Sequence, residues 1–212
     1  MNASGEIALD TTITDYTGMI KYYDSAEEMT VLAVPTANLS TTDGYVVAYN
    51  ATNNELEMVE STGGGKVLQQ VSTSYATYAS ATTVMPSDDT IPQNTEGTEI
   101  MTLAITPQSA TSTLLIEYVV PLAGSAVVNV QAGLFVDSTA SAIKASYYTT
   151  GGLNYKALMI GDHRVASAST SARTYKLRVG PAAGTIYFNG ISTGRLLGGM
   201  LQATMIITEI EA

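Results

Sequence analysis

The segment from Ile100 to Val136 has the sequence IMTLAITPQSATSTLLIEYVVPLAGSAVVNVQAGLFV. Its first seven residues alternate in character, which is the period of a β-strand with one buried face. The alternation predicts that Met101, Leu103 and Ile105 share one face and that Ile100 lies on the other. A cluster of turn-forming residues then separates this run from two further apolar runs. Short apolar runs separated by such clusters are typical of consecutive strands in an all-β fold.

The same pattern extends along most of the chain after residue 66, and no segment has a convincing helical period. So many short strands with turn signals between them predict a β-sandwich, with a jelly roll as the favoured topology. The pattern does not give the strand order. The expected strands cover residues 67–76, 100–106, 114–120, 126–136, 143–149, 155–165, 174–179, 185–188 and 201–210.

The first third of the chain contains a repeat. Gly18–Ser25 aligns without a gap on Gly44–Ala51, and in each copy a glycine opens a β-rich run that ends in an aromatic residue and Asp or Asn. A second apolar run follows each copy, which predicts two β-hairpins at 18–34 and 44–59. A two-stranded hairpin is marginal alone, so the pair is expected to stack on each other or on other chains.

The glycines Gly63–Gly65 are the clearest boundary in the sequence. Because glycine-rich segments form flexible linkers, we expect three parts. Residues 1–62 form an N-terminal arm carrying the two hairpins, residues 63–66 a linker, and residues 67–212 the head.

The composition excludes several classes of function. Only 13% of residues are charged while 45% are apolar, which suits a chain that buries surface against copies of itself. The net charge of −10 disfavours nucleic acid as a partner, since binding requires clustered Lys and Arg. There is no cysteine, and no apolar run approaches the ~20 residues of a membrane span. The N-terminus lacks the pattern of a secretion signal, so synthesis in a cytosol without processing is expected.

Several segments of the head together carry a resemblance: TIPQNTEG (90–97), ITPQSATS (105–112), LFVD (134–137), RVGP (178–181) and RLLGG (195–199). Over about 85–212 the chain resembles a domain that recurs in bacteriophage virion fibres and spikes. The resemblance implies a trimeric, tumour-necrosis-factor-like jelly roll at the end of a virion appendage. The repeats at 18–59 are similar to hairpin units of phage fibre shafts.

This resemblance implies a non-enzymatic homotrimer located in the virion and assembled in the host cytoplasm. The arm would bind another virion protein, and the head would bind a host-surface glycan. Capsid decoration without a receptor role is the alternative. A virion-borne depolymerase using carboxylates such as Asp88 and Asp162, and a cellular lectin-like trimer, are further hypotheses.

The candidate receptor-binding tyrosines flank the pair Gly151-Gly152. With no tryptophan and two phenylalanines, tyrosine must supply the aromatic faces that sugars require. The candidates are Tyr147, Tyr148, Tyr155, Lys156 and Arg195. The alternative for each tyrosine is packing at a strand end or between subunits.

His163 is the single histidine, followed by Arg164. Without cysteine or a second histidine, a transition-metal site would depend on carboxylates. No serine lies in a nucleophile motif. We therefore expect no catalytic residue, metal or cofactor. His163 is expected to make either a structural polar contact or, together with Arg164, a polar contact at the trimer axis.

Overall fold

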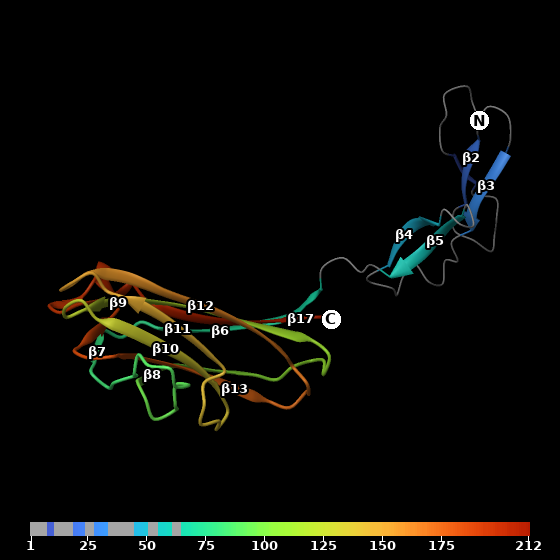
Figure 1. Cartoon of the computed structure of the whole chain (residues 1–212). Helices are drawn as coiled ribbons and strands as arrows, with labels where there is room; N and C mark the ends of the chain where they lie inside the picture. Colours follow the sequence, from blue (N-terminus) through green and yellow to red (C-terminus); the bar gives the residue numbers. More distant parts are fainter. Residues whose placement is uncertain (1–7, 11–18, 24–27, 34–44, 51–54, 61–64) are drawn as a thin grey trace. The chain divides into compact units, whose positions relative to one another are not determined.

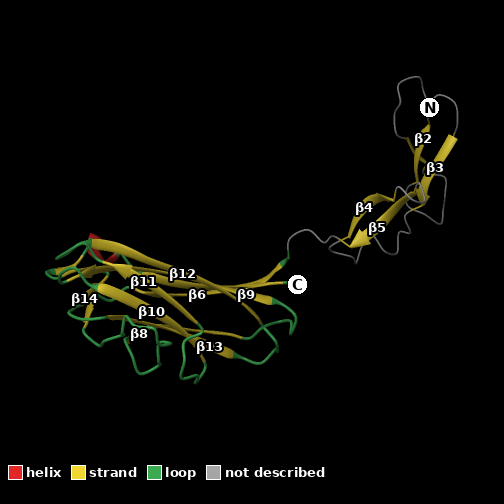
Figure 2. Ribbon diagram, viewed as in Figure 1, coloured by secondary structure: helices red, strands yellow, loops and turns green. Residues whose placement is uncertain are grey.

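A computed structural model describes residues 8–10, 19–23, 28–33, 45–50, 55–60 and 65–212. The chain divides into two compact units, Met1–Gly64 and Gly65–Ala212, and each is described by itself. Nearly all regular structure in the described residues is β-strand (Figure 2). Among those residues, no helix is both long enough and apolar enough to cross a membrane.

The first unit contains two sets of antiparallel strands. Strands β1 (Ala8–Asp10), β2 (Met19–Tyr23) and β3 (Glu28–Ala33) form a three-stranded sheet in that order, with Tyr22 opposite Met29. Strands β4 (Tyr45–Asn50) and β5 (Glu55–Glu60) form a separate pair. Each segment expected as a hairpin therefore contains one antiparallel pair. The turns of both hairpins lie outside the described residues, and their stacking stays a prediction.

The second unit, the head, is built from eight longer strands and several short ones (Figure 1). The long strands are β6 (Val67–Tyr75), β8 (Thr98–Ile105), β9 (Thr113–Gly124), β10 (Asn129–Val136), β11 (Lys144–Thr149), β12 (Lys156–Ala166), β13 (Arg173–Pro181) and β17 (Ala203–Ile210). The short elements are β7 (Ala79–Ala81), β14 (Ile186–Phe188), β15 (Gly190–Ile191), β16 (Gly194–Arg195) and the single 3-10 turn η1 (Leu197–Gly199).

The long strands form two antiparallel sheets. In the first sheet, β9 pairs with β12 on one side and with β17 on the other, and β17 pairs with β6. The second sheet has the order β11-β10-β13-β8. Numbered A to H along the chain, the strands therefore have the orders FCHA and EDGB, which is the pattern of a jelly roll with two interlocked Greek keys. The predicted all-β sandwich is confirmed for the head.

The core lies between these two sheets and comes from alternate residues of each strand. On β9, Ile116, Tyr118 and Val120 are buried, and they belong to the same apolar cluster as Leu134 and Leu177 of the second sheet. The buried Tyr118 keeps a polar partner, because its hydroxyl lies 2.8 Å from the hydroxyl of Ser146 on β11. Not every buried polar group in the head has such a partner, since both side-chain polar atoms of Gln131 and the hydroxyl of Tyr175 are buried without one.

Two sequence expectations differ from the structure. Ile100 was predicted to face away from Met101 and its partners, yet both residues are buried. The cause is a β-bulge, since Leu177 pairs with Met101 and the next residue, Arg178, already pairs with Glu99. Ile100 is thus the extra residue of the bulge, which breaks the two-residue alternation locally.

The other difference concerns β9, which continues through Pro121 to Gly124 instead of ending at Val120. Proline has no N–H to donate, so a strand can pass through it only where no ladder bond is needed. At this point β9 changes neighbours: up to Val119 it pairs with β17, and from Leu122 it pairs with β14. The Pro121 carbonyl accepts a hydrogen bond from the N–H of Asn189 at 3.1 Å.

Both ends of the head lie at one end of the sandwich, which we call the base. The Glu211 N–H donates to the Lys66 carbonyl at 2.8 Å, so the segments at the two ends of the head are hydrogen-bonded to each other. Figure 1 shows the C-terminus at this end. The loops that connect β9 to β10 and β11 to β12 lie at the opposite end, which we call the loop end.

A buried carboxylate fixes a loop at the base. Glu209 on β17 is fully buried, and it accepts hydrogen bonds from the Ser112 hydroxyl at 2.6 Å and from the Gln69 amide at 2.6 Å. It also accepts from the backbone N–H groups of Gln108 and Ser109. Burial alone would raise the pKa of Glu209, but these donors together lower it to about 2.

Candidate binding site at the loop end

The loop end is held together by a small set of hydrogen bonds. Asn154, in the left-handed conformation at φ 60°, donates its N–H to the Gly124 carbonyl at 2.9 Å. Its side-chain oxygen accepts from the N–H of Ser192 at 2.8 Å. The buried hydroxyl of Thr150 accepts from the Val128 N–H at 2.9 Å. Three separate loops are thereby joined into one surface.

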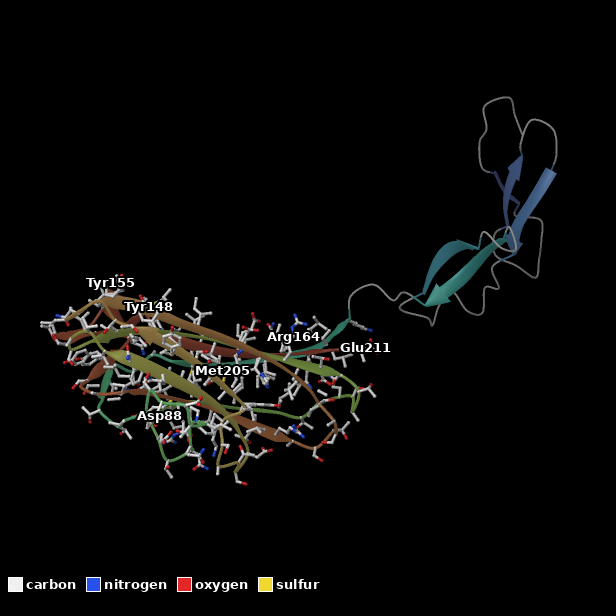
Figure 3. All side chains as sticks on the ribbon, in the orientation of Figure 1. Asp88, Tyr148, Tyr155, Arg164, Met205 and Glu211 are labelled. Carbon is white, nitrogen blue, oxygen red and sulfur yellow. The ribbon has the colours of Figure 1, made fainter. Side chains whose placement is uncertain are left out.

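The structure brings two of the three candidate tyrosines together. Burial raises the pKa of Tyr148, and the neighbouring Tyr155 raises it further. The Tyr155 ring lies on Gly151, where an added Cβ would be 2.8 Å from the ring. Figure 3 shows the two labelled tyrosines near each other, at the end of the head away from Glu211. Tyr147, which is 77% exposed, points to the other face of its strand.

Next to this loop cluster lies an apolar groove of about 340 Å³. Lys156 of the candidate set lines the groove, and the rest of the lining is aliphatic or glycine: Pro121, Leu122, Ala157, Leu158, Gly190, Leu196, Leu197 and Leu201. Sequence reasoning missed the groove because its walls come from β9, β12 and the segment before β17, which only the fold brings together.

The groove opens onto a larger exposed apolar surface on the outside of the first sheet, which we call the apolar face. Leu158 and Ile160 point outward from β12 and are 55% and 65% exposed, and Val119 lies opposite Ile160 on β9. Leu197 and Met200 extend the surface beyond the strands and are 73% and 84% exposed. Toward the base the same outer face becomes charged, with Asp162 directly opposite Glu117.

Arg195 lies on β16 and directly precedes Leu196, which lines the groove. Its guanidinium group extends over Gly199, where an added Cβ would be 3.1 Å from Nη1. Among the described residues, no hydrogen bond or ion pair links Arg195 to Tyr148 or Tyr155.

His163 and Arg164 are neighbours on β12, so their side chains point to opposite faces. His163 is half-buried toward β11, and burial, together with the Lys144 charge, lowers its pKa despite the opposing effect of Asp162. Arg164 is exposed on the outside of the first sheet, opposite Leu115. The two residues therefore do not form one polar contact within a protomer. Their role at a trimer axis stays a prediction.

The two carboxylates considered for depolymerase chemistry come from different elements of the fold. Asp88 is in a loop beside β11 of the second sheet, and hydrogen bonds from the side chain and the N–H of Thr90 lower its pKa. Asp162 is on β12 of the first sheet. In residues 65–212 no group of three or more His, Cys, Asp or Glu side chains is arranged to hold a metal ion.

A second hollow, which we call the polar pocket, lies on the outside of the second sheet and has a volume of about 250 Å³. Its lining is almost entirely polar: Asn94, Glu99, Phe135, Asp137, Ser138, Thr139, Lys176 and Arg178. Sequence reasoning did not select these residues. The signal that could have found them is the alternation of β13, where Lys176 and Arg178 share the face opposite to the buried Leu177.

Comparison with known proteins gives no family for the chain. No family model and no curated protein matches it. Among solved structures, it is similar to infectious bursal disease virus-derived T=1 particles at 12% identity and TM-score 0.32, covering 87% of this chain and 45% of that one. The chain is also similar to the VP2 subviral particle of the same virus, at 12% identity and TM-score 0.28, covering 87% of this chain and 47% of that one. A third similar structure is a family GH115 4-O-methyl-α-glucuronidase with specificity for decorated arabinogalactans. Its identity is 7% and its TM-score 0.30, and the match covers 74% of this chain and 19% of that one.

The chain spans less than half the length of each of these structures. TM-scores near 0.3 assign neither a fold nor a function to it. Its fold is defined instead by the strand pairing described above.

Proposed function

We propose that this chain is a structural protein of a bacteriophage virion, a homotrimer whose arm attaches to the particle and whose head projects outward to bind a host-surface glycan. The resemblance of residues 85–212 to phage fibre domains supplies the setting. The apolar face is the single observation that supports assembly into a trimer.

The apolar face is costly in a monomer. Leu158 and Ile160 are both more than half exposed and adjoin the groove lined by Leu196, Leu197 and Leu201. Because each of these side chains is already partly buried, covering the rest of it stabilises an association by roughly half of the ~1.5–3 kcal/mol gained by a fully exposed side chain. Large contiguous apolar patches on soluble proteins mark interaction sites. A second copy is the expected occupant, since only 13% of the chain is charged and the charge of the head is nearly balanced.

The position of the base suits this arrangement. The chain enters the head at Gly65, next to Glu211, so a tether acts at the base. The loop end with Tyr148 and Tyr155 is then directed away from the attachment point. Loops held by a rigid scaffold are where binding residues concentrate.

Sedimentation velocity on the full chain at micromolar concentration tests the trimer. We expect a trimer for the natural sequence and a monomer for the double variant Leu158→Lys, Ile160→Lys. The matched control is Ala104→Lys, which adds one charge to an exposed position on β8 of the other sheet. A natural chain that sediments as a stable monomer would overturn the proposal.

The role of the trimer is tested separately. Binding of the full chain to host cells, lost in Tyr148→Ala and Tyr155→Ala, supports adsorption. A chain that does not touch cells but whose deletion weakens the capsid is a decoration protein. Release of oligosaccharide from host capsule by the purified chain would instead make it a depolymerase.

A further inference from the structure

The polar pocket has walls from three segments that are far apart in the sequence. Asn94 comes from the loop before β8, Asp137 and Thr139 from the turn after β10, and Lys176 from β13. Phe135 lies at the bottom and is 1% exposed. Its ring has room because Gly133 precedes it on the same face, where an added Cβ would be 2.9 Å from the ring.

These walls are fixed by hydrogen bonds. Asp137, at φ 54°, exchanges bonds with Thr174: its N–H donates at 2.7 Å, and its Oδ1 accepts from the Thr174 N–H at 2.8 Å. The Asn94 side-chain amide donates to the Thr139 carbonyl at 3.0 Å. Arg178 donates from Nε to the Glu96 carbonyl at 2.7 Å. A pocket whose walls are already ordered loses little conformational entropy on binding.

The groups left over are the ones that a ligand would meet. In the part of the chain that the structure describes, the Lys176 ammonium group, Asp137 Oδ2 and the Ser138 hydroxyl have no hydrogen bond or ion pair. Glu99, by contrast, is occupied by Arg178 at 3.4 Å and by the Thr102 hydroxyl at 2.8 Å. The pocket therefore offers one free cation, one free carboxylate oxygen and one free hydroxyl.

We propose that the polar pocket binds one acidic sugar residue of a host glycan. The sugar carboxylate would accept charge-assisted hydrogen bonds from Lys176, and ring hydroxyls would donate to Asp137 Oδ2 and contact Ser138. A volume of about 250 Å³ lies just below the ~300 Å³ of the smallest drug-sized pockets, which suits a single ring. This inference rests on the proposed function, since it names the class of glycan that the head would meet.

The pocket also stays open in the proposed assembly. It lies on the outside of the second sheet, whereas the apolar face lies on the outside of the first. Association through the apolar face would thus leave one polar pocket per subunit exposed. Several weak sites on one particle strengthen attachment through avidity without a new contact.

Saturation-transfer-difference NMR on the full chain tests the site, with D-glucuronate and N-acetylneuraminate as probes and D-glucose as the neutral counterpart of glucuronate. We expect at least one acidic probe to bind with a dissociation constant on the order of 1 mM, which corresponds to ~4 kcal/mol, and glucose to bind at least tenfold more weakly. Lys176→Met should weaken the acidic probe at least tenfold. Lys144→Met, at an exposed lysine outside the pocket, should leave it unchanged.

A second variant protects the test against misfolding. Ser138→Phe places a ring at the exposed rim of the pocket and should also abolish binding, with the thermal midpoint of each variant checked. Failure of both acidic probes, equal binding of glucose and glucuronate, or full affinity in Lys176→Met would overturn the inference. Sedimentation of the same samples separates the two proposals: a trimer that binds no acidic sugar refutes the pocket alone, and a monomer that binds it refutes the assembly alone.

Discussion

At the scale of single residues, Glu209 shows how a buried charge is retained in an apolar fold. Its carboxylate satisfies the Ser112 hydroxyl, the Gln69 amide and two backbone N–H groups, so the buried charge is compensated by four donors. Removing the charge leaves donors without a strong acceptor, which is the expensive outcome for buried polar groups. The loop after Pro107 is therefore positioned by one side chain about a hundred residues away in the chain.

We predict that Glu209→Gln lowers the free energy of unfolding by roughly 1–3 kcal/mol. The pKa of Glu209 is about 2 in the folded head, below its ordinary value of 4.5, so its contribution is complete above pH 4.5 and is lost as the pH falls toward 2. Urea unfolding at pH 7 and pH 3 measures both effects, and the difference between natural chain and variant should shrink at pH 3. Glu211→Gln, at the exposed chain end, serves as the control. An unchanged difference at pH 3 would contradict the assignment.

A second residue-scale prediction concerns Gly161 on β12. A Cβ at this position would be 2.2 Å from the Tyr118 hydroxyl oxygen, in the middle of its hydrogen bond to Ser146. We expect Gly161→Ala to destabilise the head by about 1–3 kcal/mol through overpacking. Thermal unfolding measures the loss. The natural Ala157, four residues earlier on the same strand, shows that β12 accepts a methyl group at another position. A stable Gly161→Ala variant would therefore mean that Tyr118 has another rotamer available.

At the scale of elements, β11 and β12 are outer strands of the two different sheets and contact each other, and this contact can be probed through the single histidine. Burial and the charge of Lys144 lower the pKa of His163 below 6.5. A base whose pKa is lower in the folded chain than in the unfolded chain contributes to stability at pH values above its unfolded pKa. That contribution is lost as the pH falls through its folded pKa. We predict that an NMR titration of the natural chain gives a pKa below 6.5 for His163 and that Lys144→Met raises this pKa. A fall in the variant would show that the two strands are not adjacent as described.

The loop end supplies another prediction. Asn154 accepts the N–H of Ser192 and adopts a left-handed conformation that asparagine tolerates better than alanine. We expect Asn154→Ala to cost about 1 kcal/mol and to accelerate hydrogen exchange at the Ser192 amide. Asn154→Gly removes the hydrogen-bond acceptor, but glycine adopts the left-handed conformation easily. Hydrogen exchange at Ser192 should therefore still rise, while the loss of stability should be smaller than for Asn154→Ala.

The elements of the head were largely predictable because their signals are local. The alternation of residues such as Met205 and Ile207 gives a strand and its buried face, and both are buried in β17. The bulge at Ile100 and the change of partner at Pro121 were not predictable, because each depends on which strands become neighbours. The polar pocket was missed for the same reason: Asn94 and Lys176 approach only after the second sheet has formed.

At the scale of the whole molecule, the division at Gly64 predicts that residues 65–212 fold without the arm. The head has its own core in both sheets and joins its own ends through Lys66 and Glu211. We expect the isolated head to unfold cooperatively with the same thermal midpoint as the head transition of the full chain. Calorimetry of both proteins measures this, and a head that fails to fold would show that the arm contributes to the core.

The hydrogen bond between Lys66 and Glu211 has a topological consequence. Because the two ends touch, a short peptide could close the head into a ring, and the ring could be reopened at Gly151-Gly152 without rethreading any strand. In such a circular permutant the tether would leave from the surface that now carries Tyr155. The polarity of the head relative to its tether would then be reversed, with the former point of entry next to Glu211 at the free end.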